Sequence, residues 1–88
     1  MPTVHIPAHW RELTDGRATI QVPGRSLGAV VQALGTAYPE MRRVLLEEGA
    51  LRGEVAIAIN SVVTENDPLE PVEENDEIFL IPAIAGGS

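Results

Sequence analysis

One segment of the chain, residues 26–39, limits the possible folds more than any other. Its apolar residues recur at the three- and four-residue spacing of a helix with one buried face: Leu27, Val30, Val31, Leu34 and Tyr38. Ser26 is a residue type that caps helices, and Pro39 ends the pattern because proline cannot continue a helix. With 88 residues, the chain has room for one hydrophobic core. We therefore expect one main helix that packs against a sheet.

The segment before this helix predicts a β-hairpin. Residues 3–6 and 18–22 alternate apolar and polar side chains, and a proline follows each stretch. Between them, Asp15-Gly16 favours a tight turn. The connecting loop is long, and we expect its Trp10 and Leu13 to pack inward.

The segment after the helix predicts further strands. Residues 55–60 alternate large aliphatic side chains with small ones, so the bulky face of this strand should meet the main helix. Residues 61–71 are polar and predict a turn, with at most a short edge strand at 69–72. Residues 77–81 form a last strand that is apolar on both faces.

These elements together predict an α+β domain. A second, shorter helix is expected at residues 41–48, with Gly49 as its stop signal. The fold is then a mixed sheet of four or five strands around one main helix. Residues 1–82 would form the domain, and residues 83–88 a flexible tail that carries Gly-Gly.

The composition excludes several classes of function. Because the chain has no cysteine, it has no disulfide, thiolate metal site or cysteine nucleophile. A net charge of -7 disfavours binding to nucleic-acid phosphates and favours a basic partner. Without an apolar run near the ~20 residues of a membrane span, or a signal-peptide pattern, we expect a cytoplasmic protein with no membrane partner. The familiar catalytic motifs are absent, so catalysis by the chain alone is not expected.

Two groups of polar side chains are weak site signals. His5 and His9 are four residues apart, but Pro7 prevents the helix that would bring both rings to one metal, so we expect no metal site. Seven carboxylates between residues 65 and 77 lack the spacing of a calcium loop: Glu65, Asp67, Glu70, Glu73, Glu74, Asp76 and Glu77. That stretch is either a solvated face or an electrostatic docking surface for a basic partner.

The end of the chain carries the most specific signal. Two successive glycines, Gly86 and Gly87, let an extended tail enter a narrow channel because no Cβ obstructs it. Residues 83–87 reach about 17 Å when extended, enough to enter a partner's active site. The alternative is a frayed end without a function.

The segment that leads into this tail resembles the C-terminus of the MoaD/ThiS family of ubiquitin-like sulfur carrier proteins. In that family an acidic turn, the last strand of a β-grasp fold, a proline and small apolar residues precede a terminal Gly-Gly. Here the segment reads Asn75-Asp76-Glu77-Ile78-Phe79-Leu80-Ile81-Pro82-Ala83-Ile84-Ala85-Gly86-Gly87. Similar positions occur along nearly the whole chain: Ile6-Pro7, Leu13-Thr14-Asp15-Gly16, Ser26-Leu27-Gly28, Tyr38-Pro39 and Asn60. The ending is most similar to the CysO-type carriers, with the small subunit of molybdopterin synthase next.

The resemblance implies a carrier and not an enzyme. A partner would use ATP to adenylate Gly87, next to Gly86, and a sulfur donor would convert the adenylate to a thiocarboxylate. The chain itself would bind no cofactor. The implied partners are an adenylating enzyme and a sulfur acceptor, such as a cysteine synthase or the large subunit of molybdopterin synthase. The pathway stays open between cysteine, molybdopterin and another sulfur-containing metabolite.

Ser88 departs from the family pattern, because activation needs Gly87 to be terminal. A metalloprotease removes Ser88, or Ser88 is an added residue, or it is a deliberate block; the sequence leaves all three open. Two other functions also stay open. The chain could be a protein modifier joined through Gly87 to lysines of other proteins, or a non-covalent β-grasp interaction module. It has no lysine, so it cannot be its own side-chain acceptor.

The last strand predicts where partners dock. If Ile78 and Leu80 face the helix, Phe79 and Ile81 face outward. The predicted docking surface combines these two residues with two alanines of the neighbouring strand and the start of the tail: Phe79, Ile81, Ala56, Ala58, Pro82, Ala83, Ile84 and Ala85. The alternative is that the Trp10 loop or the N-terminal strand covers this patch.

Overall fold

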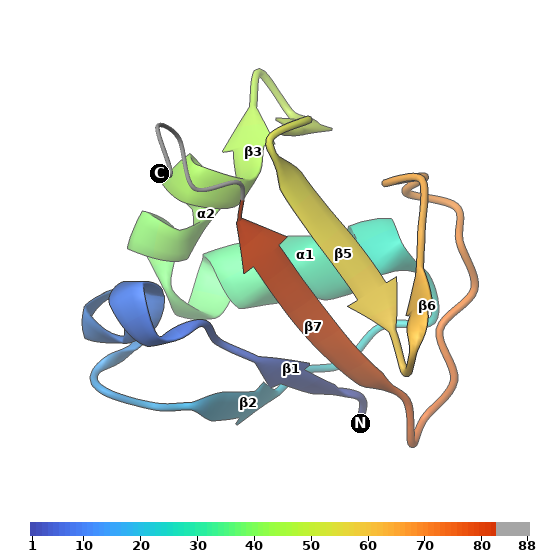
Figure 1. The fold of residues 1–88 in the computed structure, drawn as a ribbon, viewed down its shortest axis with the longest axis horizontal. Coiled ribbons are helices and arrows are strands. Elements are labelled where there is room, and N and C mark those ends of the chain that lie inside the picture. The colour runs from blue at the N-terminus through green and yellow to red at the C-terminus, as the bar shows by residue number, and fades with distance from the viewer. Residues whose placement is uncertain (83–88) are drawn as a thin grey trace.

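The computed structural model describes residues 1–82, and residues 83–88 lie outside the described part. A mixed sheet of five strands packs on one face against helix α1 (Leu27–Ala37) (Figure 1). The predicted α+β fold, with a mixed sheet around one main helix, is confirmed. This packing lets the helix and the sheet bury their apolar faces in one shared core.

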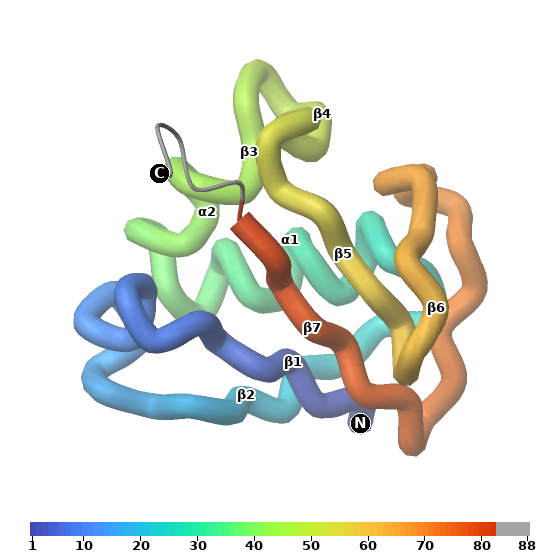
Figure 2. The backbone as a smooth tube through the Cα atoms, in the orientation of Figure 1, coloured from blue at the N-terminus to red at the C-terminus, as the bar shows by residue number. Residues whose placement is uncertain are grey.

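The last strand along the chain lies in the middle of the sheet. Strand β7 (Glu77–Pro82) pairs in parallel with β1 (Thr3–His5) and antiparallel with β5 (Val55–Ile59). Strands β2 (Thr19–Gln21) and β6 (Val62–Val63) complete the order β2-β1-β7-β5-β6. Figure 2 shows the consequence, since the blue start of the chain runs beside its red end.

The N-terminal hairpin forms as predicted. Strands β1 and β2 are antiparallel, with Val4 opposite Ile20. Asp15 (φ 56°) and Gly16 (φ 81°) adopt left-handed backbone angles in the connection between them. Asp and Gly tolerate these angles better than other residues, which explains why the turn forms here.

The long loop of this hairpin contains a 3₁₀ helix that the sequence did not predict, η1 (Ala8–Thr14). Trp10 and Leu13, within it, pack partly buried against the core, as expected. The hydroxyl of the buried Thr14 lies 3.0 Å from the carbonyl oxygen of Arg17. The hydrogen bond satisfies a polar group that would otherwise be costly to bury.

Helix α1 begins and ends as predicted. The Ser26 hydroxyl accepts a hydrogen bond of 3.2 Å from the amide of Ala29, which caps the helix. After α1, Pro39 opens the next helix, α2 (Pro39–Leu45), where its missing N–H leaves no bond unmade. The buried residues of α1 are Leu27, Val30, Val31, Leu34 and Gly35, of which Gly35 packs against Arg42 of α2.

The second helix is shorter than predicted. It ends at Leu45, and the residues expected to continue it form a small hairpin of β3 (Leu46–Glu47) and β4 (Ala50–Leu51). Glu48 (φ 53°) and Gly49 (φ 83°) take the left-handed angles that such a two-residue hairpin turn requires. Gly49 therefore turns a hairpin and does not stop a helix.

The edge strand also lies elsewhere than predicted. It is β6, directly after β5, whereas the sequence predicted at most a short edge strand at residues 69–72. There Leu69 is 81% exposed, and Pro71 makes an isolated bridge to the residue before α1. Pro68 and Pro71 lack the N–H groups that a ladder needs, which explains the error.

Aliphatic side chains fill the core from the sheet and both helices. The largest that are fully buried are Ile6, Leu27, Leu34, Met41, Leu45, Ile57 and Ile78. Within residues 1–82, every buried side-chain nitrogen and oxygen has a hydrogen-bond partner. None of the helices in this part of the chain is long and apolar enough to cross a membrane.

The substitution Leu34→Ala tests the role of α1. We expect the free energy of unfolding to fall by about 2–5 kcal/mol, because the change leaves a cavity between helix and sheet. Leu69→Ala is the matched control, and should change the value by no more than about 0.5 kcal/mol because Leu69 is exposed. Urea unfolding of both variants measures the difference, and equal losses would contradict this packing.

Candidate functional site

Four of the residues predicted for docking lie on the face of the sheet that α1 does not cover: Phe79, Ile81, Ala56 and Ala58. Along β7, Ile78 and Leu80 are buried under the helix, whereas Phe79 and Ile81 are 36% and 45% exposed. The strand period of two produces this alternation. The predicted orientation of β7 is therefore confirmed, and its outer face stays open.

The two alanines of β5 differ in accessibility. Ala56 lies opposite Ile81 and Ala58 opposite Phe79, as the predicted patch requires. Ala56 is half-buried, but Ala58 is only 6% exposed. Ala58 therefore forms the floor of the patch and offers a partner little contact area.

Two residues that the sequence-based prediction missed extend the patch across the sheet. Val63 of β6 is paired with Ala58 and is exposed, and His5 of β1 is paired with Phe79. One row thus crosses all five strands: Thr19, His5, Phe79, Ala58 and Val63. Two adjacent valines, Val62 and Val63, were the signal in the sequence that pointed to this extension. Their place in the sheet could not be predicted, because the edge strand was expected at residues 69–72.

Of the predicted docking surface, Trp10 approaches Pro82. Its indole lines a cleft of about 260 Å³ at the far end of β7, together with Val44, Val55 and Pro82. The ring of His5, from the N-terminal strand, stacks against Phe79. Phe79 nevertheless stays 36% exposed. The alternative that the N-terminal strand covers the patch therefore holds only in part, because the His5 side chain covers one side of Phe79.

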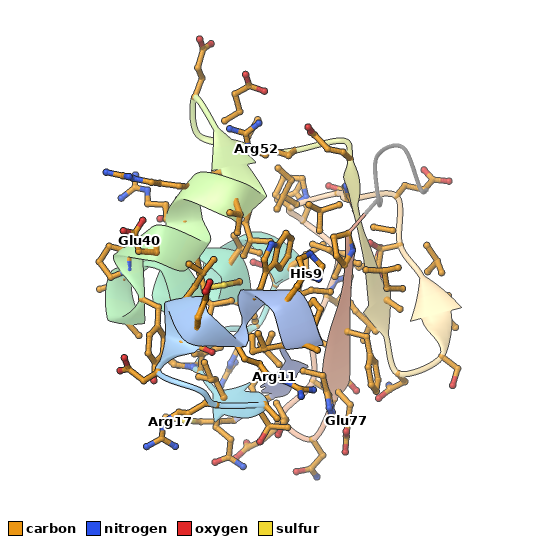
Figure 3. All side chains as sticks on the ribbon, turned by 60° about the vertical axis from the view of Figure 1, so that its left-hand side comes forward. His9, Arg11, Arg17, Glu40, Arg52 and Glu77 are labelled. Atoms are coloured by element: carbon orange, nitrogen blue, oxygen red, sulfur yellow. The ribbon has the colours of Figure 1, made fainter. Side chains whose placement is uncertain are left out.

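Charge is distributed unevenly along β7. At the end where the tail begins, Arg43 and Arg52 line the cleft, and their guanidinium groups lie within 3.6–4.0 Å of glutamates. At the other end lie Glu77 and the acidic turn before it. Figure 3 shows this separation, with Arg52 and Glu77 at opposite ends of the molecule. Ion pairs this exposed contribute about 0–1 kcal/mol each, so they shape the local field more than the stability.

The two histidines have different neighbours. His5 Nε2 lies 2.5 Å from Glu77 Oε1, whereas the His9 ring tilts against Trp10 with 5.4 Å between centroids. Within residues 1–82, no group of three or more His, Asp or Glu side chains is arranged to hold a metal ion.

Asn60 anchors the start of β7, a role the sequence-based prediction did not assign. Its backbone is left-handed (φ 58°), and its amide nitrogen Nδ2 donates to Asp76 Oδ1 at 3.0 Å. Its Oδ1 accepts from the amide of Glu77, also at 3.0 Å. These bonds hold β7 in register with β5, and so place Phe79 over Ala58.

The described part of β7 ends at Pro82, which is half-buried and lines the Trp10 cleft. The other predicted site residues lie outside the described residues: Ala83, Ile84, Ala85, Gly86, Gly87 and Ser88. Their roles in docking and activation stay predictions.

Comparison with known proteins identifies the family. The family model described as the ThiS family matches residues 4–87. The chain belongs to the ThiS family. This confirms the resemblance drawn from the C-terminal segment.

Relatives of this ThiS-family chain share its length and fold. The sulfur carrier protein CysO of Mycobacterium tuberculosis (strain ATCC 25618 / H37Rv) is 28% identical over 91 residues, with 97% of each chain covered. A chain in the crystal structure of the Amycolatopsis orientalis BexX/CysO complex has the same fold, with a TM-score of 0.90, 21% identity, and 99% of this chain and 100% of that chain covered. The small archaeal modifier protein 1 (SAMP1) of Methanosarcina acetivorans has a TM-score of 0.84 at 27% identity, covering 98% of this chain and 95% of its own. The predicted β-grasp fold is thereby confirmed.

Asn60 can be tested by two substitutions. Asn60→Ala should lower the free energy of unfolding by about 1–3 kcal/mol, because it removes two hydrogen bonds and strains a left-handed position. Asn60→Gly removes the same bonds but relieves the backbone, so its loss should be smaller. Thermal unfolding compares them, and identical losses would show that backbone strain is not part of the role.

Proposed function

We propose that this chain is a sulfur carrier that works through the carboxylate of Gly87. The observation that supports this most strongly is the family match over residues 4–87, which runs through the Gly-Gly. The CysO relative, similar over 97% of both chains, is itself a sulfur carrier protein. The chain supplies a chemical handle, and partner enzymes supply the catalysis.

The proposed chemistry follows from the poor reactivity of a carboxylate. An oxygen of the Gly87 carboxylate attacks the α-phosphorus of ATP on the partner and displaces pyrophosphate, which gives an acyl adenylate. A sulfur donor at the oxidation level of sulfide then attacks the acyl carbon, displaces AMP and loses its protons, so that no oxidant or reductant is needed. The product is a thiocarboxylate, which an acceptor enzyme receives in a site shielded from water.

The proposed partners bind the outer face of β7. An adenylating enzyme and a sulfur acceptor must both take the tail, so both would meet the patch of Phe79, Ile81 and Val63 near its root. We favour a cysteine synthase as the acceptor because of the CysO relative, with the large subunit of molybdopterin synthase as the alternative. If Ser88 is native, a metalloprotease that removes it belongs to the same pathway.

Intact mass spectrometry tests the carrier function. The protein is incubated with ATP, sulfide and the adenylating enzyme of its own host, as the full chain and as a version that ends at Gly87. We expect the shorter version to gain the mass difference between sulfur and oxygen. A gain in the full chain only after loss of Ser88 makes processing part of the mechanism, and no gain in either version would overturn the proposal.

Phe79→Glu tests the docking face. A charge placed in the centre of an apolar interface is desolvated without a partner, so we expect adenylation at limiting carrier concentration to slow by about tenfold or more. Gln32→Glu is the control, because Gln32 is exposed on α1, on the opposite side of the sheet from Phe79. Unchanged adenylation of the Phe79 variant would remove this face from the interface.

The similarity to SAMP1 supports a second candidate, a protein modifier joined through Gly87 to lysines of other proteins. The same activation serves both functions, so the acceptor discriminates between them. Tagged protein ending at Gly87 would form covalent adducts in a host lysate if it is a modifier. A carrier would form thiocarboxylate without such adducts.

A further inference from the structure

Three side chains on the outer face of the sheet contact one another next to the patch. The rings of His5 and Phe79 stack with 4.2 Å between their centroids and 10° between their planes. Nε2 of the same imidazole lies 2.5 Å from Oε1 of Glu77. The parallel register of β1 and β7 produces the contact, since it places His5 beside Phe79 and Thr3 beside Glu77.

The carboxylate fixes the imidazole in one orientation. An ionised carboxylate can only accept hydrogen bonds, so Nε2 of His5 carries the proton in this contact, whether the ring is neutral or charged. The imidazole is then held by two neighbours, Glu77 at its edge and Phe79 on its face.

On its other side the Phe79 ring has little to hold it. The residue opposite Phe79 on β5 is Ala58, whose side chain is a single methyl group. An exposed phenylalanine beside an alanine could occupy more than one rotamer. The stacked imidazole of His5 is therefore a contact that restrains the ring.

We propose that His5 is a positioning residue for docking, which holds Phe79 in the orientation that partners bind. The inference rests on the proposed function, because it concerns the interface through which the carrier is activated. A ring held in its bound orientation binds more tightly, since less rotamer freedom is lost on binding. Glu77 acts one step further away, by holding His5.

His5 meets a carboxylate on one neighbouring strand and uncharged side chains on the other. Glu77 faces it from β7, and from β2 the side chains on this face are Thr19 and Gln21, which do not ionise. From η1, the Nε of Arg11 donates to the carbonyl oxygen of the residue after His5 at 3.1 Å. The hydrogen bond to Glu77 therefore holds the edge of the imidazole while Phe79 holds its face.

Fluorine NMR tests the contact in the isolated protein. Phe79 is the single phenylalanine of the chain, so labelling with 4-fluorophenylalanine gives one signal. We expect His5→Ala to shift this signal, because it removes the ring that stacks on Phe79. His9→Ala should leave the signal where it is in the wild type, because His9 contacts Trp10 instead.

Kinetics of adenylation test the consequence for docking. With the full set of partners, His5→Ala should raise the KM for the carrier about two- to tenfold, the value of one aromatic pair, with kcat unchanged. His5→Tyr keeps an aromatic face and should restore most of the loss. If His5 only stabilised the fold, His5→Ala would not raise KM while leaving kcat unchanged, and His5→Tyr would not restore KM.

Two results would overturn the proposal. The first is a Phe79 signal that is the same in the wild type and in His5→Ala. The second is an unchanged KM in His5→Ala, which would show that the contact exists without serving docking. A wild-type protein that is never adenylated would overturn the proposed function and the docking role together, and the fluorine signal would still decide whether His5 holds the ring.

Discussion

The pairing of β7 between β1 and β5 is the constraint on which the rest of the structure depends. It closes the sheet from segments at opposite ends of the chain, and it gives α1 the face on which Ile78 and Leu80 are buried. The same strand exposes Phe79 and Ile81 on its other face and leads directly toward the tail. One element thus links the core, the proposed docking patch and the segment that carries the proposed reactive end.

The sequence predicts those features that depend on local periodicity. The spacing of two along β7 and β5 placed Phe79 and Ile81 outward, and the spacing of three and four placed α1 against the sheet. Prediction from the sequence fails where a residue suits more than one kind of turn. Glycine at position 49 suits both a helix end and a hairpin, and packing of the preceding residues in the core decides for the hairpin.

Neighbours across strands could not be predicted, because they depend on the strand order. Nothing along the chain states that His5 lies beside Phe79, or that Val63 lies beyond Ala58. Net charge has the same limit: the value of -7 describes the whole chain, yet the root of the tail lies among arginines paired with glutamates. A partner that takes the tail meets this balanced end, so the expectation of a basic partner applies to the acidic end near Glu77.

The central position of the last strand has a consequence for biosynthesis. During translation, β1 and β5 emerge from the ribosome early but cannot complete the sheet until residues 77–82 follow them. Contacts between segments this far apart also form late in folding, since a long loop must close first. A truncated or misfolded chain therefore lacks both the patch and a correctly placed exit for the tail. Under the proposed function, the fold itself would restrict activation to finished molecules and spare the partners from spending ATP on defective ones.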